Sequence, residues 1–363
     1  MARISRVLAA TIVVGWALTG APGGAAEGSD VRAGVGPKPV SIDRLAFGPD
    51  GSFFVADNQG ATIYAIDLDR SGAAPGLKPI EGVDTLVAAM MGTGAEQVFF
   101  TDLAVDPKSG QAYVAAMRRS GESALFRIDG NGAVKPVSLA GRPYTSVTLP
   151  NPPPQVLGYR GNRVNTVTDM AYDGGRLYVA GLSNEEFASN LRSIPYPFRP
   201  ADRGTGTEIF HTSHGDLETR SPVYTFLPMR IQGRAELLAA YICTPLVRLP
   251  IEALKPGGNV HGITIAEMGR HNRPLDMVRY TKDGADWLLT ANSRRGLLKT
   301  PIAAIEAAPA IDGFSAIDTR DLGSQRVQAI SDVEQIDLAG GGLFVALSHP
   351  YGGRADLKVA TLP

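Results

Sequence analysis

The residues best suited to direct chemistry in this sequence are few, with five histidines and a single cysteine among 363 residues. His211 and His214 stand three positions apart, a spacing that suits two ligands of one metal ion, and Cys243 and Met268 add sulfur further along the chain. Imidazole, thiolate and thioether groups together are typical of a copper or zinc site. The alternative is that both histidines fill a loop and that Cys243 is a small buried hydrophobic residue.

Carboxylates recur at one position of a repeated pattern, in which an acidic residue begins an apolar strand that a glycine turn joins to a second apolar strand. The acids are Asp43, Asp102, Asp169, Asp276 and Glu334, and Thr225 takes this place in a weaker copy. Hard oxygen ligands at this density suit Ca²⁺ or Mg²⁺, because carboxylates that gather without a cation repel one another. Alternatively, each acid caps its own hairpin through backbone N–H groups, and the recurrence itself favours that structural role.

Polar residues that differ from copy to copy follow the second strands, and variation on a repeated scaffold is where we look for chemistry. These residues are Asn58, Asn184, Cys243, Asn292 and His349. We expect a metal site built from Asp276, Glu334, Asn184 and Asn292, with His211 and Cys243 as further metal-binding candidates. We expect His214 and His349 to move protons.

Arginines accompany these residues, and their planar forks bind carboxylate or phosphate with two hydrogen bonds. Eight of them fall in the same class of loop: Arg118, Arg119, Arg160, Arg163, Arg220, Arg273, Arg294 and Arg295. The alternative for most is a solvated rim that balances the acids. Our candidates for ligand binding are Arg220, Arg273, Asn58 and His271.

The spacing within the repeat predicts the elements that position these side chains. Asp43 to Gly51, Asp102 to Gly110, Asp276 to Gly284 and Glu334 to Gly342 are each eight positions apart. Short apolar strands joined by glycine turns, without a long amphipathic helix, predict an all-β protein. We expect a single six-bladed β-propeller with four-stranded antiparallel blades, and seven blades are the alternative.

Strand direction alternates within a blade, so the start of the first strand and the end of the second lie on one face. The expected site therefore surrounds one mouth of the central channel. The last copy lacks an outer strand, and we expect residues 38–41 to supply it. We expect residues 141–168 to cross between two blades as a proline-stiffened loop.

Residues 1–26 have the features of a secretory signal, with Arg3 and Arg6 before an apolar run and small residues ending at Ala26. The propeller domain then occupies residues 27–363, in the periplasm or outside the cell. The 35 basic and 36 acidic residues leave a formal charge of −1, which excludes nucleic-acid binding by bulk charge. No later stretch suits a membrane span. We expect a small-molecule ligand or a protein partner.

The segment from Leu45 to Asn58, LAFGPDGSFFVADN, resembles a blade of the gluconolactonase/regucalcin-like and NHL-type six-bladed propellers, and the copies cover most of the mature chain. The passage from Glu208 to Leu298 is similar to uncharacterised secreted bacterial propeller proteins. The lactonase-like resemblance implies a divalent cation at the channel mouth that helps to open a lactone or ester. The matching residue types are Glu334 or Asp43, Asn184, Asn292 and Asp276. The alternative is a non-catalytic binding or interaction propeller, with a histidine–cysteine copper site as one version.

Overall fold

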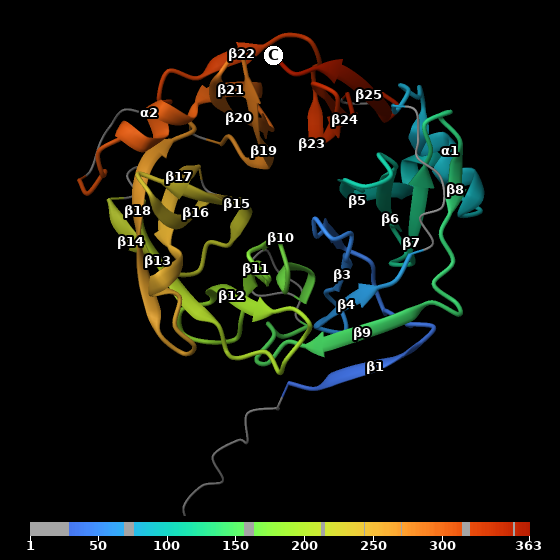
Figure 1. Ribbon diagram of the computed structural model, residues 1–363, viewed down its shortest axis with the longest axis horizontal. Coiled ribbons are helices and arrows are strands. Elements are labelled where there is room, and N and C mark those ends of the chain that lie inside the picture. Colours follow the sequence, from blue (N-terminus) through green and yellow to red (C-terminus); the bar gives the residue numbers. More distant parts are fainter. Residues whose placement is uncertain are drawn as a thin grey trace, which may run out of the picture.

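The computed structural model describes residues 29–68, 76–155, 163–211, 215–242, 244–269, 271–313, 320–350 and 353–363. Within these segments antiparallel sheets stand in a ring around a central axis, as Figure 1 shows. Two α-helices are present there, α1 (Val83–Met90) and α2 (Ile302–Ala307). Neither has the length and apolar character that a membrane crossing requires. The expected leader, residues 1–26, lies outside the described residues.

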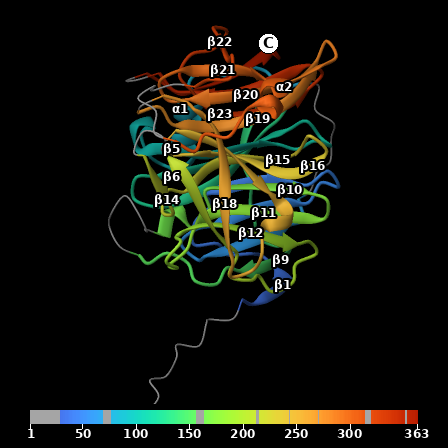
Figure 2. The same ribbon diagram turned by 90° about the vertical axis from the view of Figure 1, so that its left-hand side faces the viewer.

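The hairpins expected from the repeat are all present, and their strands run across the thickness of the ring (Figure 2). The pairs are β2 (Arg44–Phe47) with β3 (Phe53–Asp57), β5 (Val98–Val105) with β6 (Ala112–Arg118), β10 (Asp169–Asp173) with β11 (Arg176–Leu182), β15 (Val223–Ile231) with β16 (Arg234–Tyr241), β19 (Pro274–Lys282) with β20 (Ala285–Asn292), and β23 (Val333–Gly340) with β24 (Leu343–Ser348).

Glycine is required in these turns because the backbone turns through the left-handed region. Gly110 has φ of 68° and Gly284 has φ of 76°, values that residues with a Cβ adopt only with strain. The eight-residue spacing is therefore the distance from the start of an innermost strand to its turn.

Further strands extend each hairpin outward. The third strands are β4 (Thr62–Ile66), β7 (Ser123–Ile128), β12 (Ser189–Pro195), β17 (Pro245–Pro250), β21 (Gly296–Pro301) and β25 (Asp356–Thr361). Outside them lie β8 (Val134–Pro136), β13 (Thr205–His211), β18 (Asn259–Glu267) and β22 (Gln325–Val327), while β14 (Asp216–Glu218) pairs with β13. A parallel pairing of β13 with β18 joins two meanders into one nine-stranded sheet.

Two expectations about the outer strands are wrong. Residues 143–148 do not cross as a loop, because β9 (Pro143–Thr148) pairs with β4 and so extends the first sheet, and β1 (Val31–Val35) pairs with β9 beyond it. Residues 38–41 supply no outer strand, because the backbone N–H groups of Val40 and Ser41 donate to the Asp57 carboxylate. Instead, Ile80 forms an antiparallel bridge with Leu357 on β25.

The innermost strands form a closed circuit in the order β2, β5, β23, β19, β15, β10 and back to β2. Apolar faces of adjacent sheets pack against each other, as where Phe54 of β3 and Leu177 of β11 share one buried cluster. Both side chains are fully buried, and each such burial stabilises the fold by about 2–3 kcal/mol. This packing holds the inner ends of the strands at fixed positions around the axis.

Candidate functional site

Four aspartates on innermost strands link neighbouring sheets through backbone hydrogen bonds. Asp102 on β5 accepts from its own neighbour Leu103 (3.0 Å) and from Leu45 on β2 (2.7 Å). Asp276 on β19 likewise accepts from Met277 (2.8 Å) and from Ile336 on β23 (2.8 Å). The same two contacts recur at Asp169, with Met170 and Phe226, and at Asp337, with Leu338 and Val105. These contacts favour the structural reading of the repeated acids.

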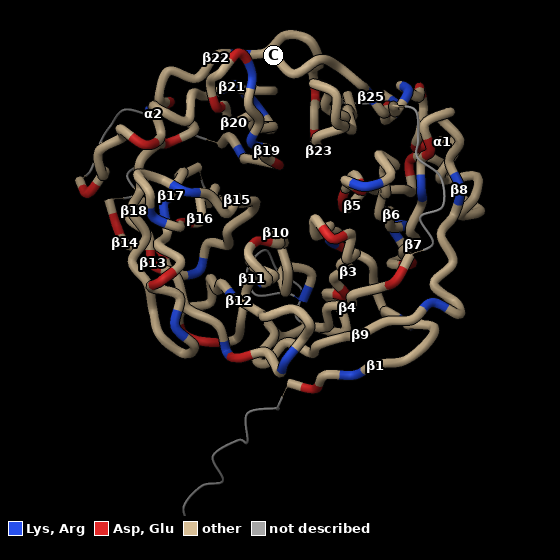
Figure 3. Tube along the Cα trace, in the orientation of Figure 1, with Lys and Arg blue, Asp and Glu red and all other residues tan. Residues whose placement is uncertain are grey.

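The surroundings of these four carboxyls raise their pKa values. Burial raises the pKa of Asp102 to about 7, against the attraction of the nearby Arg44 guanidinium. Burial raises the pKa of Asp169 and of Asp337 to about 6. Burial, reinforced by the charge of Asp102, raises the pKa of Asp276 well above its ordinary value. Asp102, Asp169 and Asp337 therefore have pKa values of about 6 to 7, and Figure 3 shows acidic positions along the inner strands around the axis.

Two other side chains occupy this inner ring with the carboxyls. The guanidinium of Arg44 on β2 donates to the carbonyl oxygen of Thr101 (2.6 Å) and lies 5.8 Å from the centre of the Tyr224 ring. With its amide nitrogen turned to the carboxyls, Gln335 donates to Asp276 Oδ2 (3.2 Å) and Asp102 Oδ1 (3.0 Å). The ring is thus held by its own donors and one internal cation.

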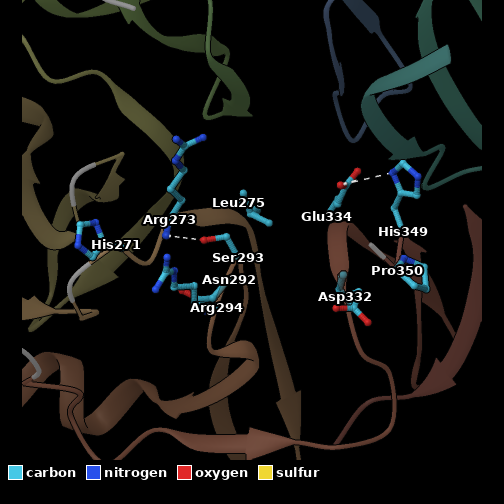
Figure 4. Close-up of a pocket in the computed structure, with 11 residues that line it drawn as sticks. His271, Arg273, Leu275, Asn292, Ser293, Arg294, Asp332, Glu334, His349 and Pro350 are labelled. Atoms are coloured by element: carbon cyan, nitrogen blue, oxygen red, sulfur yellow. Dashed lines mark hydrogen bonds and ion pairs between the residues drawn. The ribbon is translucent and has the colours of Figure 1, made fainter. Parts of the chain in front are cut away.

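A polar cavity of about 630 Å³ opens beside this ring, between the ends of β19 and β20 and those of β23 and β24. We call it the mouth cavity. Its lining consists of His271, Arg273, Leu275, Asn292, Ser293, Arg294, Asp332, Val333, Glu334, His349 and Pro350. Figure 4 shows the basic residues on one side and Glu334 with His349 on the other. The structure therefore brings together five of the site candidates, namely Arg273, His271, Asn292, Glu334 and His349, with Arg294 from the same class of loop.

Glu334 and His349 form the chemically distinctive pair of this cavity. The Nδ1 atom of His349 lies 3.7 Å from Oε1 of Glu334, and the two side chains are 40% and 45% exposed. Burial raises the pKa of Glu334, while the neighbouring His349 lowers it. Because the carboxylate faces Nδ1, the other ring nitrogen is left to exchange a proton with a bound molecule.

The opposite wall is held by contacts between the chain before β19 and the β20–β21 turn. Arg273 N–H donates to Ser293 Oγ (2.9 Å), and Ser293 N–H donates to the Arg273 carbonyl (2.9 Å). Asn272 donates through Nδ2 to Asn292 Oδ1 (2.8 Å) and accepts at Oδ1 from the backbone of Arg294 and Arg295. Asn292 and Asn272 thereby act as the frame of this wall.

Four further site candidates lie in the described chain but do not line the mouth cavity. Asn58 is buried and donates to the carbonyls of Val164 (2.7 Å) and Val167 (3.0 Å), so it fastens the chain before β10. Asn184 and Arg220 are exposed, and His211 is buried at the end of the outer strand β13. His214 and Cys243 lie outside the described residues, and their roles stay predictions.

Sequence reasoning missed Asp337, Asp332 and Arg326. The eight-residue spacing aligned Glu334 with the other acids, but β23 has register shifts between Val333 and Gln335 and between Leu338 and Gly340. The first shift puts Gln335, not Glu334, at the register position that Asp102 and Asp276 occupy after similar shifts on their own strands, and Asp337 stands two residues further along β23. Asp332 precedes its strand at φ 54°, and only the folded ring brings it to the cavity.

The described segments contain no group of three or more histidine, cysteine, aspartate or glutamate side chains placed to hold a metal ion. Of the expected ligands, Glu334 and Asn292 line the mouth cavity, while both oxygens of Asp276 accept backbone hydrogen bonds. The Asn292 amide is also engaged, because its Nδ2 donates to the Thr290 carbonyl (3.0 Å). The described donors do not fit the expected divalent cation, and its presence stays a prediction.

No family model and no curated protein matches this sequence. Solved structures with similarity to it include the PQQ-bound aldose sugar dehydrogenase of Streptomyces coelicolor, at 16% identity over 92% of this chain and 98% of that chain, with a TM-score of 0.26. A putative oxidoreductase (glucose dehydrogenase) of Thermus thermophilus has 13% identity over 91% and 100%, with a TM-score of 0.34. Virginiamycin B lyase of Staphylococcus aureus has 10% identity over 92% and 100%, with a TM-score of 0.32. These are propeller-type proteins, and the scores are too low to bear on activity.

Proposed function

We propose that this protein is an exported six-bladed β-propeller of the gluconolactonase/regucalcin-like or NHL type, which binds a small polar molecule in the mouth cavity and hydrolyses a lactone or ester there. The six blades are supported by the circuit of innermost strands and by the nine-stranded sheet, which divides at its parallel pair into two meanders. Export to the periplasm or beyond is supported by the leader-like residues 1–26.

The observation that carries the proposed activity is the mouth cavity itself, where a His349–Glu334 pair faces a basic wall. A lactone or ester needs a base that activates water and a positive group that receives the developing oxyanion. His349 takes a proton from water as the water oxygen bonds to the carbonyl carbon. The acyl C–O bond then breaks, and the leaving oxygen receives that proton from His349. A lactone gives a hydroxy acid in this way, and an ester gives an acid and an alcohol. Arg273 lies on the wall that would hold the carbonyl oxygen.

A divalent cation would add Lewis-acid chemistry, with Ca²⁺ or Mg²⁺ expected ahead of Zn²⁺ or copper. Asp276 and Asn292 are not free to bind this cation, because their side-chain oxygens already accept hydrogen bonds within the fold. Metal analysis of the purified mature protein tests this cation. Turnover that chelation abolishes and added Ca²⁺ or Mg²⁺ restores would establish the metal-assisted version, and stoichiometric copper lost in Cys243→Ser would establish the copper version.

Non-catalytic binding is the second candidate function, and one observation favours it. The His349–Glu334 separation of 3.7 Å exceeds a hydrogen bond, and both side chains are about two-fifths exposed. A base oriented so loosely must tighten when a ligand enters, whereas binding alone makes no such demand.

The deciding experiment compares His349→Gln with His261→Gln in a panel of lactones and esters. His261 on the outer strand β18 is a matched control, because its Nδ1 also faces a glutamate, Glu208 on β13, at 3.2 Å. We expect His349→Gln to lower kcat by about 10²–10⁴-fold and His261→Gln to leave it unchanged. Equal turnover in the two variants, or no turnover of any panel member by the wild type, refutes the hydrolase and leaves the binding function.

A further inference from the structure

A second cavity of about 350 Å³ adjoins the mouth cavity, and we call it the side compartment. The two cavities share Asn292, Ser293, Arg294 and Asp332 in their linings. The side compartment lies between the β20–β21 turn and the chain that leads from β22 into β23. A molecule bound at His349 can therefore extend past Arg294 into a second space.

Two arginines, Arg294 and Arg326, line the side compartment. Arg294 and Arg326 are both exposed, and within the described segments neither guanidinium makes an ion pair or a hydrogen bond. Elsewhere on the same sheet arginines do find carboxylates, since Arg295 contacts Asp321 at 2.9 Å and Arg279 contacts Asp286 at 2.6 Å. Arg294 and Arg326 thus differ from Arg279 and Arg295 of the same sheet in having no carboxylate contact among the described residues.

The fold brings these two arginines to one place. Arg326 stands on β22 opposite Leu298 of β21, and a Cβ built on Gly296 would lie 3.7 Å from its Nε and Nη2 atoms. The guanidinium therefore lies against the same β20–β21 turn that carries Arg294.

The remaining lining is neutral apart from one carboxylate. Gln328, Ser331 and Asn292 contribute amide and hydroxyl groups, and Asp332 stands at the boundary of the two cavities. The Asp332 carbonyl also accepts the backbone N–H of His349 (2.8 Å). Two cations against one carboxylate leave the compartment positive, and paired guanidinium groups favour a compact oxyanion.

We propose that the side compartment binds an oxyanion carried by the ligand, a carboxylate or a phosphonate-like group, at a distance from the end that reaches His349. This inference rests on the proposed function of the mouth cavity and names its substrate class, which is a lactone or ester with an anionic tail. Hydrolysis of such a substrate gives a product with two anionic ends, one at the mouth wall and the other between Arg294 and Arg326.

The test measures binding of product-like probes to the mature protein by titration calorimetry at fixed, low ionic strength. Glutarate has two carboxylates, butyrate has one, and 4-phosphonobutyrate replaces the second carboxylate by a phosphonate. We expect the wild type to bind glutarate or 4-phosphonobutyrate at least tenfold more tightly than butyrate, and the preferred dianion identifies the oxyanion. Arg326→Gln should lose about tenfold of that dianion's affinity and leave butyrate binding unchanged.

Arg230→Gln is the matched control, because Arg230 is an exposed arginine of the β15–β16 hairpin and donates to the Gly233 carbonyl. Equal affinity for glutarate, 4-phosphonobutyrate and butyrate, equal losses in the Arg326 and Arg230 variants, or no binding of any probe overturns the inference. Dianion preference without any lactone or ester turnover leaves the inference standing and removes the hydrolase. Turnover of a lactone or ester without dianion preference overturns the inference and leaves the hydrolase standing.

Discussion

Replacement of Asp102 by asparagine tests the ring of titrating carboxyls that joins the innermost strands. Asp102 is 8% exposed, and its folded pKa of about 7 lies far above the ordinary value of 3.8. The folded carboxyl keeps its proton to a higher pH than the unfolded one. The folded state therefore binds more protons between these two pKa values, and stability rises as the pH falls through about 7.

The size of the effect follows from the two pKa values. Between about pH 8 and about pH 5 the linkage relation assigns Asp102 a gain of about 2.5 kcal/mol in the free energy of unfolding. Asparagine cannot take up this proton, so Asp102→Asn should flatten the pH dependence by about that amount. Asparagine also has one acceptor oxygen fewer for the N–H groups of Leu45 and Leu103. This loss lowers the free energy of unfolding by about 1–3 kcal/mol at every pH.

The assay is urea unfolding of the wild type and the variant at several pH values across that range. Asp286→Asn is the control, because contacts with Thr281 and Arg279 lower the pKa of Asp286, which therefore does not titrate in this window. Should Asp102→Asn unfold at neutral pH, Asp169→Asn at a second position of the ring gives the same comparison, since the pKa of Asp169 is about 6. An unchanged pH dependence in both ring variants would falsify the reasoning.

Two further predictions concern stability. Gly181→Ala should destabilise the fold by about 3 kcal/mol, because the new Cβ would lie 2.0 Å from the Thr166 carbonyl oxygen, whereas Gly313→Ala has open space and should unfold at the wild-type urea concentration. Glu236→Ala should lower the free energy of unfolding by about 3 kcal/mol in the same assay, because it leaves the Arg248 guanidinium without its nearly buried ion-pair partner at 2.7 Å. A loss below about 1 kcal/mol, the value expected for an exposed ion pair, would contradict this.

The six hairpins could be predicted from the sequence, because each is specified by residues that are close together in the chain. The turn glycine, the apolar strands and the acid eight positions earlier identify the pair β5 and β6 without any knowledge of the rest of the chain. The outer strands are different, because β9 pairs with β4 only after the whole second sheet has intervened. Nothing close to residues 143–148 in the sequence indicates that partner.

The candidate site shows the same division. His349, Glu334 and Asn292 were found because strand direction in a repeated sheet predicts which ends share a face, and all three line the mouth cavity. Asp276 stood at the predicted strand start, yet its oxygens bind backbone N–H groups, a use that only the register of β19 against β23 reveals. Arg326 lies on a short outer strand with no motif, so only the folded chain places it beside Arg294.

The pairing of β9 with β4 has a consequence for how the molecule is made. After β2, β3 and β4 have been synthesised, the outer edge of β4 is still unpaired. The strand that covers this edge, β9, is synthesised about eighty residues later. The bridge from Ile80 to Leu357 joins residues that are about three quarters of the chain length apart. Assembly that waits for distant partners is slow, so nascent chains should be shielded by chaperones until the final strand arrives.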